Sequence, residues 1–224
     1  KEGIVIDRSQ GYIGVLIDDL VTKESHEPYR MMTSRAEYRL LLRQDNADMR
    51  LTKIGYEVGL IDEERYQKLL KKEEMIEKEI ERVEHTNVGT TEAVQALLES
   101  YESTPLTSGT TLAELIRRPE LSYEKIAPID KHREELPYDV KEQVDINIKY
   151  DGYIKRQMRQ VEQFKKLENK RIPENINYDE IQSLRLEAKQ KLNQIRPSSI
   201  GQASRISGVS PADVSVLLVY LSSK

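Results

Sequence analysis

Residues 62–84 read DEERYQKLLKKEEMIEKEIERVE and carry the strongest fold signal in the chain. Apolar side chains recur every three or four positions, from Tyr66 through Leu69 to Val83, and lysine and glutamate fill the positions between them. This spacing is typical of a long amphipathic helix with one buried face. The 224-residue chain has no tryptophan, one phenylalanine and 33% charged residues, which suits long exposed helices. We therefore expect a mainly α protein.

Two shorter helices are expected after this segment. Thr90 and Thr91 precede residues 93–98, and Thr111 precedes residues 112–117. A threonine hydroxyl in this position accepts a hydrogen bond from a free backbone N–H of the first helical turn. We therefore predict that threonine caps begin both helices.

The segment after Pro137 fits two patterns. Val140, Val144 and Ile148 form a helical row that continues to Val161, whereas the alternating apolar residues between 144 and 150 also suit a strand. The longer pattern favours a helix, and we predict one here.

The C-terminal residues predict three further helices. The first covers residues 183–195, and the last two form a helix-turn-helix over residues 200–221. Gly208 marks the turn, Ser210 is placed to cap the final helix, and proline follows at its first position. The final helix carries no cation, so it is suited to burial rather than to reading DNA.

The N-terminal residues give a different signal. Residues 3–7 and 11–18 are short runs rich in β-branched side chains, which are typical of strands. Gly11 and Gly14 fit strand-edge or bulge positions, because the rest of a phosphate-loop motif is missing. The predicted fold class is mainly α, with a C-terminal multi-helix region and a short N-terminal β segment.

Arginine is concentrated between Pro28 and Lys53. If Ser34 caps a helix, Arg35, Arg39 and Arg43 fall at i, i+4 and i+8 and form one guanidinium stripe. The stripe suits a polyanion such as a phosphate backbone, but arginines in this pattern are more often a solvated face or partners of nearby carboxylates. Both interpretations remain open at this level.

A second basic segment lies between Lys149 and Arg171. Eight cations face three acids there, although the chain has a net charge of −4. Lys155, Arg156 and Arg159 occupy neighbouring positions on the predicted helix. Tyr153 beside them is placed to stack on a base, although tyrosines are more often packed than used as stacking platforms. This asymmetry favours nucleic acid as a partner of the basic part.

Several classes of function lack their residues in this sequence. There is no cysteine, and the three histidines stand apart from one another, so no thiol chemistry, zinc site or catalytic triad is indicated. No apolar run reaches eighteen residues, and no signal peptide is recognisable. We expect a cytoplasmic location, no membrane contact, and no catalytic, metal-binding or cofactor-binding residue in the chain.

Seven segments together resemble the MnmG/GidA family of tRNA uridine-modifying flavoproteins. They are DLVTK at 19–23, EPYRM at 27–31, TSRAEYRLLLR at 33–43, DNADMRLT at 45–52, YDGYIKRQ at 150–157, RPSSIGQASRISGVSPA at 196–212 and LLVYL at 217–221. Members of this family carry an N-terminal dinucleotide-binding domain, and the chain has no strand followed by G-x-G-x-x-G and a helix. The resemblance therefore implies a C-terminal fragment, with its β segment cut from a larger FAD-binding domain.

The resemblance also implies an activity, cofactors and partners for the full-length protein. Such an enzyme uses FAD and NADH, acts with the GTPase MnmE, and builds carboxymethylaminomethyl or aminomethyl groups at C5 of the tRNA wobble uridine. A homodimer is implied for the full-length protein. We expect residues 1–54 to form the junction with the flavin domain, 55–135 an acidic helical region, and 136–224 a helical subdomain for tRNA and partner binding.

The prediction for this chain is a non-catalytic part that binds tRNA and the partner GTPase. The alternative is a purely structural helical module that packs or dimerises without touching RNA, its arginines held in ion pairs. The predicted nucleic-acid-binding residues are Arg35, Arg39, Arg43, Arg50, Tyr153, Lys155, Arg156, Arg159, Arg196 and Arg205.

Overall fold

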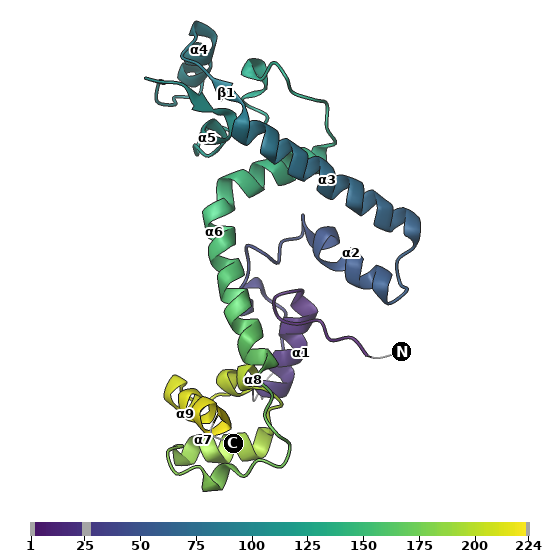
Figure 1. The fold of residues 1–224 in the computed structure, drawn as a ribbon, viewed down its shortest axis with the longest axis vertical. Coiled ribbons are helices and arrows are strands. Elements are labelled where there is room, and N and C mark those ends of the chain that lie inside the picture. The colour runs from purple at the N-terminus through teal and green to yellow at the C-terminus, as the bar shows by residue number, and fades with distance from the viewer. Residues whose placement is uncertain (1–2, 24–27, 223–224) are drawn as a thin grey trace. The chain divides into compact units, whose positions relative to one another are not determined.

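The structure is a computed structural model that describes residues 3–23 and 28–222. Within these ranges it contains nine α-helices and one two-stranded sheet, which confirms the mainly α class (Figure 1). The chain divides into two compact units. Arg43–Lys155 form the central unit, and the described residues before Arg43 form the terminal unit together with those from Arg156 onward.

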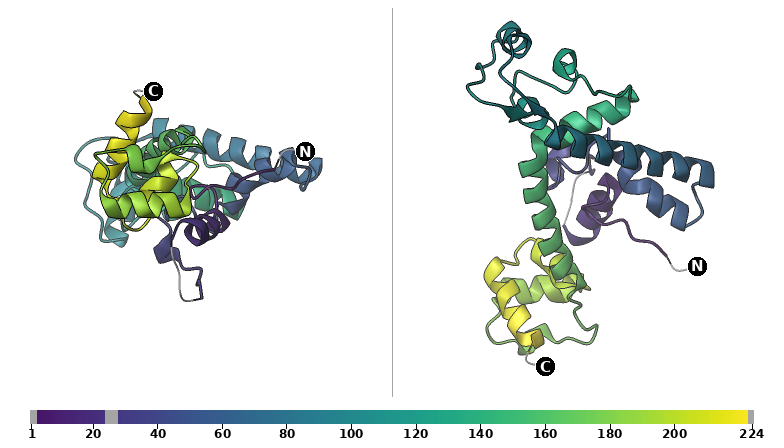
Figure 2. Two further views of the ribbon diagram at one scale, coloured as in Figure 1. Left: turned by 90° about the horizontal axis from the view of Figure 1, so that it is seen from below. Right: turned by 45° about the horizontal axis from the view of Figure 1, so that its top comes forward.

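The central unit contains most of the regular structure that the sequence predicts. Its elements are α2 (Ala47–Glu57), α3 (Glu63–His85), β1 (Asn87–Val88), α4 (Glu92–Ser100), β2 (Thr110–Thr111), α5 (Leu112–Ile116), the 3₁₀ turn η2 (Ala127–Ile129) and the first part of α6 (Tyr138–Asn169). The strands β1 and β2 pair antiparallel, with Asn87 opposite Thr111. Helices α2 and α3 pack side by side (Figure 2).

Local capping explains where these helices begin. Asp62 accepts a hydrogen bond from the backbone N–H of Arg65 at 2.8 Å and starts α3. The hydroxyls of Thr91 and Thr111 accept from Val94 and Glu114 and start α4 and α5. Each cap satisfies a backbone donor that has no partner inside the helix. The prediction of threonine caps is confirmed.

The core of the central unit lies between α3, α4, α5 and α6. Its fully buried side chains include Val83, Leu98, Leu112, Ile126 and Val144. Val144 and its neighbours are helical from residue 138 to residue 169, so the helix predicted after Pro137 is confirmed and the strand alternative is excluded.

The terminal unit contains α1 (Tyr12–Thr22), the 3₁₀ turn η1 (Thr33–Arg35), the last part of α6, the 3₁₀ turn η3 (Tyr178–Glu180), α7 (Leu186–Ile195), α8 (Ile200–Arg205) and α9 (Pro211–Ser222). Tyr178, Leu192, Ile200 and Leu217 are buried together where η3, α7, α8 and α9 meet. A second cluster joins Val15 of α1 to Tyr38 and Leu42 and to Val161 and Phe164 of α6.

The C-terminal helix-turn-helix is confirmed. Helix α8 ends at Arg205, Gly208 has φ of +94°, and α9 begins at Pro211. The Ser210 hydroxyl accepts from the backbone N–H of Asp213, as a cap does. Helix α7 begins at Leu186 rather than at residue 183, because Asp213 accepts hydrogen bonds from both the backbone and the guanidinium of Arg185.

The prediction of an N-terminal β segment is wrong. Residues 3–7 are extended without a strand partner among the described residues, and residues 12–22 form helix α1. The helix packs Val15 into the cluster around Tyr38, and Asp18 and Asp19 bind the Arg8 guanidinium. These tertiary contacts outweigh the β preference of the local sequence.

The prediction that three arginines form a stripe on a helix is also wrong. Only Thr33–Arg35 form a 3₁₀ turn, and the chain then passes through turns to Arg43, so Arg35, Arg39 and Arg43 share no helical face. Ala36, Tyr38 and Leu42 are buried and hold this segment in an irregular conformation.

No helix in the part of the chain that the structure describes is long and apolar enough to cross a bilayer.

Candidate nucleic-acid interface

The second half of α6 presents a basic face in the terminal unit. Arg156, Arg159 and Lys166 are exposed and lie at i, i+3 and i+10, which places them on one side of the helix. The opposite side carries Val161 and Phe164, which pack in the cluster with Tyr38. No hydrogen bond or ion pair joins these three cations to another of the residues described. We call Arg156, Arg159 and Lys166 the basic face of α6.

Tyr153 and Lys155 belong to the same helix but lie in the central unit. The ring of Tyr153 is 62% exposed, and Lys155 pairs with Asp151 one turn earlier at 2.8 Å. An exposed pair of this kind contributes only a few tenths of a kcal/mol, roughly, to stability. Lys155 therefore exchanges this partner easily.

Arg35 and Arg39 are exposed in the terminal unit. The guanidinium of Arg35 lies 4.4 Å from the centre of the Tyr29 ring in a cation–π contact. No side-chain hydrogen bond or ion pair of Arg39 falls on the residues described. Both arginines are accessible to an anion.

Arg43 and Arg50 organise a loop in the central unit. Arg43 pairs with Asp45 at 3.0 Å and donates to Gln143 of α6, while Arg50 donates to Asn46 and to the backbone carbonyl of Arg43. These contacts hold the turn that leads into α2. The geometry gives both arginines a structural role.

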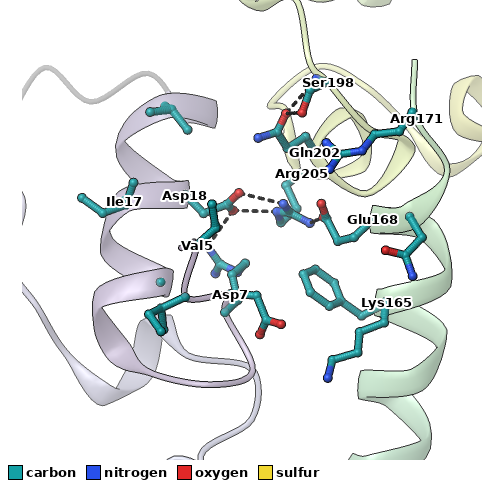
Figure 3. A pocket seen from close by; sticks show the side chains of 16 residues that line it. Val5, Asp7, Ile17, Asp18, Lys165, Glu168, Arg171, Ser198, Gln202 and Arg205 are labelled. Carbon is teal, nitrogen blue, oxygen red and sulfur yellow. Dashed lines mark hydrogen bonds and ion pairs between the residues drawn. The ribbon is translucent and has the colours of Figure 1, made fainter. Parts of the chain in front are cut away.

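Arg205 joins a network of buried charges in the terminal unit (Figure 3). Its guanidinium binds both carboxylate oxygens of Asp18, at 2.6 and 2.7 Å, and Glu168 of α6 at 2.5 Å. The side chain is 13% exposed and also lies over the Phe164 ring. Burial alone would lower the pKa of Arg205, but its hydrogen bonds with Asp18 and Glu168 raise it. This guanidinium is committed to carboxylates of its own chain.

Arg8 forms the centre of the same network. It is 2% exposed, and it donates to Asp18 at 2.9 Å, to Asp19 at 2.7 Å and to Glu37 at 2.7 Å. Asp19 also receives hydrogen bonds from Lys23 and Tyr29. Burial alone would raise the pKa of Asp19, but these donors hold it below its ordinary value. Asp19 stays charged at neutral pH, and the contacts of Arg8 with Asp18, Asp19 and Glu37 fix α1 to the chain on either side of it.

Comparison with known proteins identifies the family to which this chain is similar. A family model described as "tRNA modifying enzyme MnmG/GidA C-terminal helical domain" matches residues 63–158, and one described as "tRNA modifying enzyme MnmG/GidA C-terminal helical bundle" matches residues 160–224. The chain belongs to the MnmG/GidA family.

Relatives and solved structures agree with MnmG/GidA membership. The chain is 70% identical to a "tRNA uridine 5-carboxymethylaminomethyl modification enzyme MnmG" of Lachnoclostridium phytofermentans and 57% identical to one of Geobacillus kaustophilus, over 99% of this chain and 35% of each relative. It is similar to Aquifex aeolicus GidA in the form II crystal, with a TM-score of 0.82 and 41% identity over 99% of this chain and 34% of that one. The chain thus spans about a third of the length of these relatives.

A cavity lies between α1 and the end of α6, and the MnmG/GidA resemblance implies a dinucleotide cofactor in the full-length protein. Its volume is about 540 Å³, and Arg8, Asp18, Glu168 and Arg205 lie in its wall (Figure 3). A dinucleotide site needs a glycine that lets a pyrophosphate approach the backbone. Gly14 gives no such opening, because the carbonyls of Ile6 and Asp7 fill the space beside it. The residues of this cavity do not fit a flavin or nicotinamide dinucleotide.

Sequence reasoning missed Arg8, Asp19 and Glu168 in this MnmG/GidA chain. Adjacent residues of a strand point to opposite sides, whereas in α1 Asp18 and Asp19 both reach the same guanidinium. The signal that was available is the absence of another cation in residues 3–17, which leaves Arg8 as the local partner for two adjacent acids. The described residues contain no group of three or more side chains placed to hold a metal ion.

Proposed function

We propose that the chain is a tRNA-contacting helical part of an enzyme that installs carboxymethylaminomethyl or aminomethyl groups at C5 of the tRNA wobble uridine. The basic face of α6 is the observation that carries this proposal. Arg156, Arg159 and Lys166 are exposed, lie on one side of a helix, and have no carboxylate partner among the described residues. Such cations contact phosphates, and each contact releases condensed counterions.

Six other predicted residues support the proposal to different degrees. Arg35, Arg39, Tyr153 and Lys155 are exposed and are assigned to RNA contact with the basic face. Arg43 and Arg50 hold a loop of the central unit, and their contact with RNA stays a prediction. Arg205 is not assigned to RNA, because its guanidinium already binds Asp18 and Glu168.

Catalysis is assigned to the whole enzyme. We place FAD and NADH in the part of the relatives' polypeptide that this chain does not match, since the residues described here offer no dinucleotide cradle. An MnmE-like GTPase partner, a homodimer of the full-length protein and a cytoplasmic location are further parts of the proposal. The contribution of this chain is to bind and position RNA.

The alternative is a structural module without RNA contact. The network of Arg8 and Arg205 favours it for the residues around α1, because their charges are matched internally. It leaves the basic face of α6 without a function.

The test measures tRNA binding across a salt series. A variant with Arg156, Arg159 and Lys166 changed to alanine is compared with a control in which Lys68, Lys71 and Lys78 of α3 are changed to alanine. Both variants lose three exposed cations, so their net charges are equal. The first is expected to weaken binding and to reduce the slope of log K against log salt by about 2–3, since each lost phosphate contact removes about 0.7–0.9.

The control is expected to keep the slope of the unmodified chain. Equal losses in both variants would mean that net charge alone attracts RNA, and that the basic face is not the contact surface. No saturable binding by the unmodified chain at about physiological salt would favour the structural alternative.

A further inference from the structure

The cavity between α1 and the end of α6 does not fit a dinucleotide, but its size and lining suit a smaller ligand. Its volume of about 540 Å³ falls within the usual range for a small-molecule site. Val5 and Val21 line it beside α1 and are 88% and 58% exposed, so the cavity has open apolar surface. Arg171, Ser198 and Gln202 line it near the start of α8 (Figure 3). We call this part the α8 end of the cavity.

The acids in the wall of this cavity are bound by other groups of the chain. Asp18 and Glu168 both accept from the Arg205 guanidinium, at 2.6 and 2.5 Å. Arg8 also binds Asp18, so these two carboxylates are matched by two guanidinium groups. Asp7 accepts two hydrogen bonds from the serine two positions later, and Figure 3 shows it away from the α8 end. The α8 end is therefore open to an anion.

The side chain of Gln202 is held in one orientation. Its Oε1 atom accepts a hydrogen bond from the Ser198 backbone N–H at 2.8 Å and another from the Ser198 hydroxyl at 3.0 Å. A backbone N–H only donates, so its partner is the carbonyl oxygen of the side chain and not the amide nitrogen. The amide nitrogen of Gln202 thus carries two N–H groups that have no hydrogen-bond partner among the described residues.

Arg171 is the second donor at the α8 end. Its side chain is exposed, and Figure 3 draws it toward Gln202. No side-chain hydrogen bond or ion pair of Arg171 falls on the residues that the structure describes. Arg196, in contrast, does not line this cavity and donates to the Ile176 carbonyl at 2.9 Å, so its contact with RNA stays a prediction. Arg171 and Gln202 therefore bring unpaired donors and one positive charge to the α8 end.

We propose that the α8 end of this cavity binds the phosphate of a nucleotide, with Arg171 and the Gln202 amide donating to phosphate oxygens. Guanidinium groups match phosphate geometry well, and glutamine amides are common donors to phosphates of nucleic acids. Val5 and Val21 offer apolar surface to the ribose or the base. The nucleotide is either free or part of an RNA strand. In the RNA case the site rests on the proposed function, to which it adds one phosphate contact.

Titration of the chain with uridine 5′-monophosphate and with inorganic phosphate tests this inference. The NMR signals of the Gln202 side-chain amide are followed, because they report on the proposed donor itself. We expect a saturable shift with each ligand and a Kd of about 1 mM for the nucleotide. Uridine monophosphate should bind more tightly than phosphate, since only the nucleotide also reaches the apolar surface. Equal affinities would overturn the assignment to a nucleotide.

Two variants remove the donors, and a third is their control. Gln202→Glu keeps an oxygen for the two Ser198 donors but replaces the amide N–H groups with a charged oxygen, so nucleotide affinity should fall by about tenfold or more. Arg171→Gln removes an exposed charge and should weaken binding by about tenfold. Arg30→Gln removes an exposed cation of the terminal unit that does not line the cavity, and it should bind normally. Melting temperatures show that each variant is folded.

Competition with a single-stranded RNA oligomer distinguishes the two sources of the ligand. Displacement of the mononucleotide by the oligomer places an RNA nucleotide in the site, and failure to displace it indicates a free nucleotide. The proposal is overturned if the Gln202 signals show no saturable shift up to about 10 mM nucleotide, if Arg171→Gln binds like the unmodified chain, or if Arg30→Gln loses as much affinity as Arg171→Gln. The alanine variant of the basic face should bind the mononucleotide normally, so either proposal can fail alone.

Discussion

Gly14 and Gly152 make a matched pair for testing the packing of α1. Both glycines lie inside helices, so replacement by alanine brings the same gain of about 1 kcal/mol in helix propensity at each site. Their surroundings differ. A Cβ atom at Gly152 would meet nothing within 4 Å, whereas one at Gly14 would lie 2.5 Å from the Ile6 carbonyl oxygen and closer still to that of Asp7.

The expected results have opposite signs. Gly152→Ala should stabilise the chain by about 1 kcal/mol, because nothing opposes the propensity gain. Gly14→Ala must displace the backbone that leads into Arg8, at a cost of about 3 kcal/mol or more, which leaves a net loss of about 2 kcal/mol or more. In a chain of this size, 1 kcal/mol corresponds to about 2–4 °C in melting temperature.

Thermal unfolding followed by circular dichroism measures both variants, with Gly89→Ala as a control at a loop position where a Cβ would also meet nothing within 4 Å. The melting temperature should rise by about 2–4 °C for Gly152→Ala and fall by about 4–8 °C for Gly14→Ala. If Gly14→Ala melts at or above the temperature of the unmodified chain, α1 does not pack against residues 6 and 7 in the way described.

Three further measurements test the interior. Arg8→Met should destabilise the chain by about 3–5 kcal/mol in urea unfolding, because Asp19 is left buried and without its guanidinium partner. Lys68→Ala breaks an exposed ion pair and should leave the unfolding midpoint nearly unchanged. Leu98→Ala should cost about 2–5 kcal/mol, since the side chain is fully buried in the central core; a smaller loss would mean that the core collapses around the cavity. Hydrogen bonds from Arg185 hold the pKa of Asp213 well below its usual range, so the stabilising effect of the Asp213 carboxylate is complete above about pH 4 and is lost as the pH falls through its folded-state pKa. Acid unfolding of Asp213→Asn should lack this loss of stability at low pH. An unchanged acid-unfolding profile would contradict this role of Asp213.

Sequence reasoning succeeded where local interactions decide the structure. Thr91 and Thr111 begin helices through hydrogen bonds to residues three positions away, so the spacing alone reveals them. Gly208 and Ser210 mark the last turn for the same reason. The long helix over residues 63–85 follows from its periodic apolar face.

Sequence reasoning failed where contacts between residues far apart in the chain decide the structure. The residues of α1 favour a strand, and the helix is fixed by Arg8 and by packing against Tyr38 and Val161. Arg205 has its main partner, Asp18, 187 positions away, so the sequence gives no sign that this guanidinium is already paired. Lys155, Arg156 and Arg159 are exposed on α6, where the predicted helix places them, and their contact with RNA stays a prediction. Lys166, which completes the basic face, was not among the predicted residues.

The ion pair between Asp18 and Arg205 has a consequence for the order in which the chain folds during synthesis. The terminal unit is discontinuous, and its N-terminal part leaves the ribosome before the whole central unit, which has its own core. Central-unit contacts are therefore complete while Asp18 still lacks Arg205. Until the end of α6 and α8 emerge, α1 is held only by Arg8 and by residues 29–42 and lacks its contacts with Val161 and Arg205, so this nascent segment is a natural target for a chaperone or a protease.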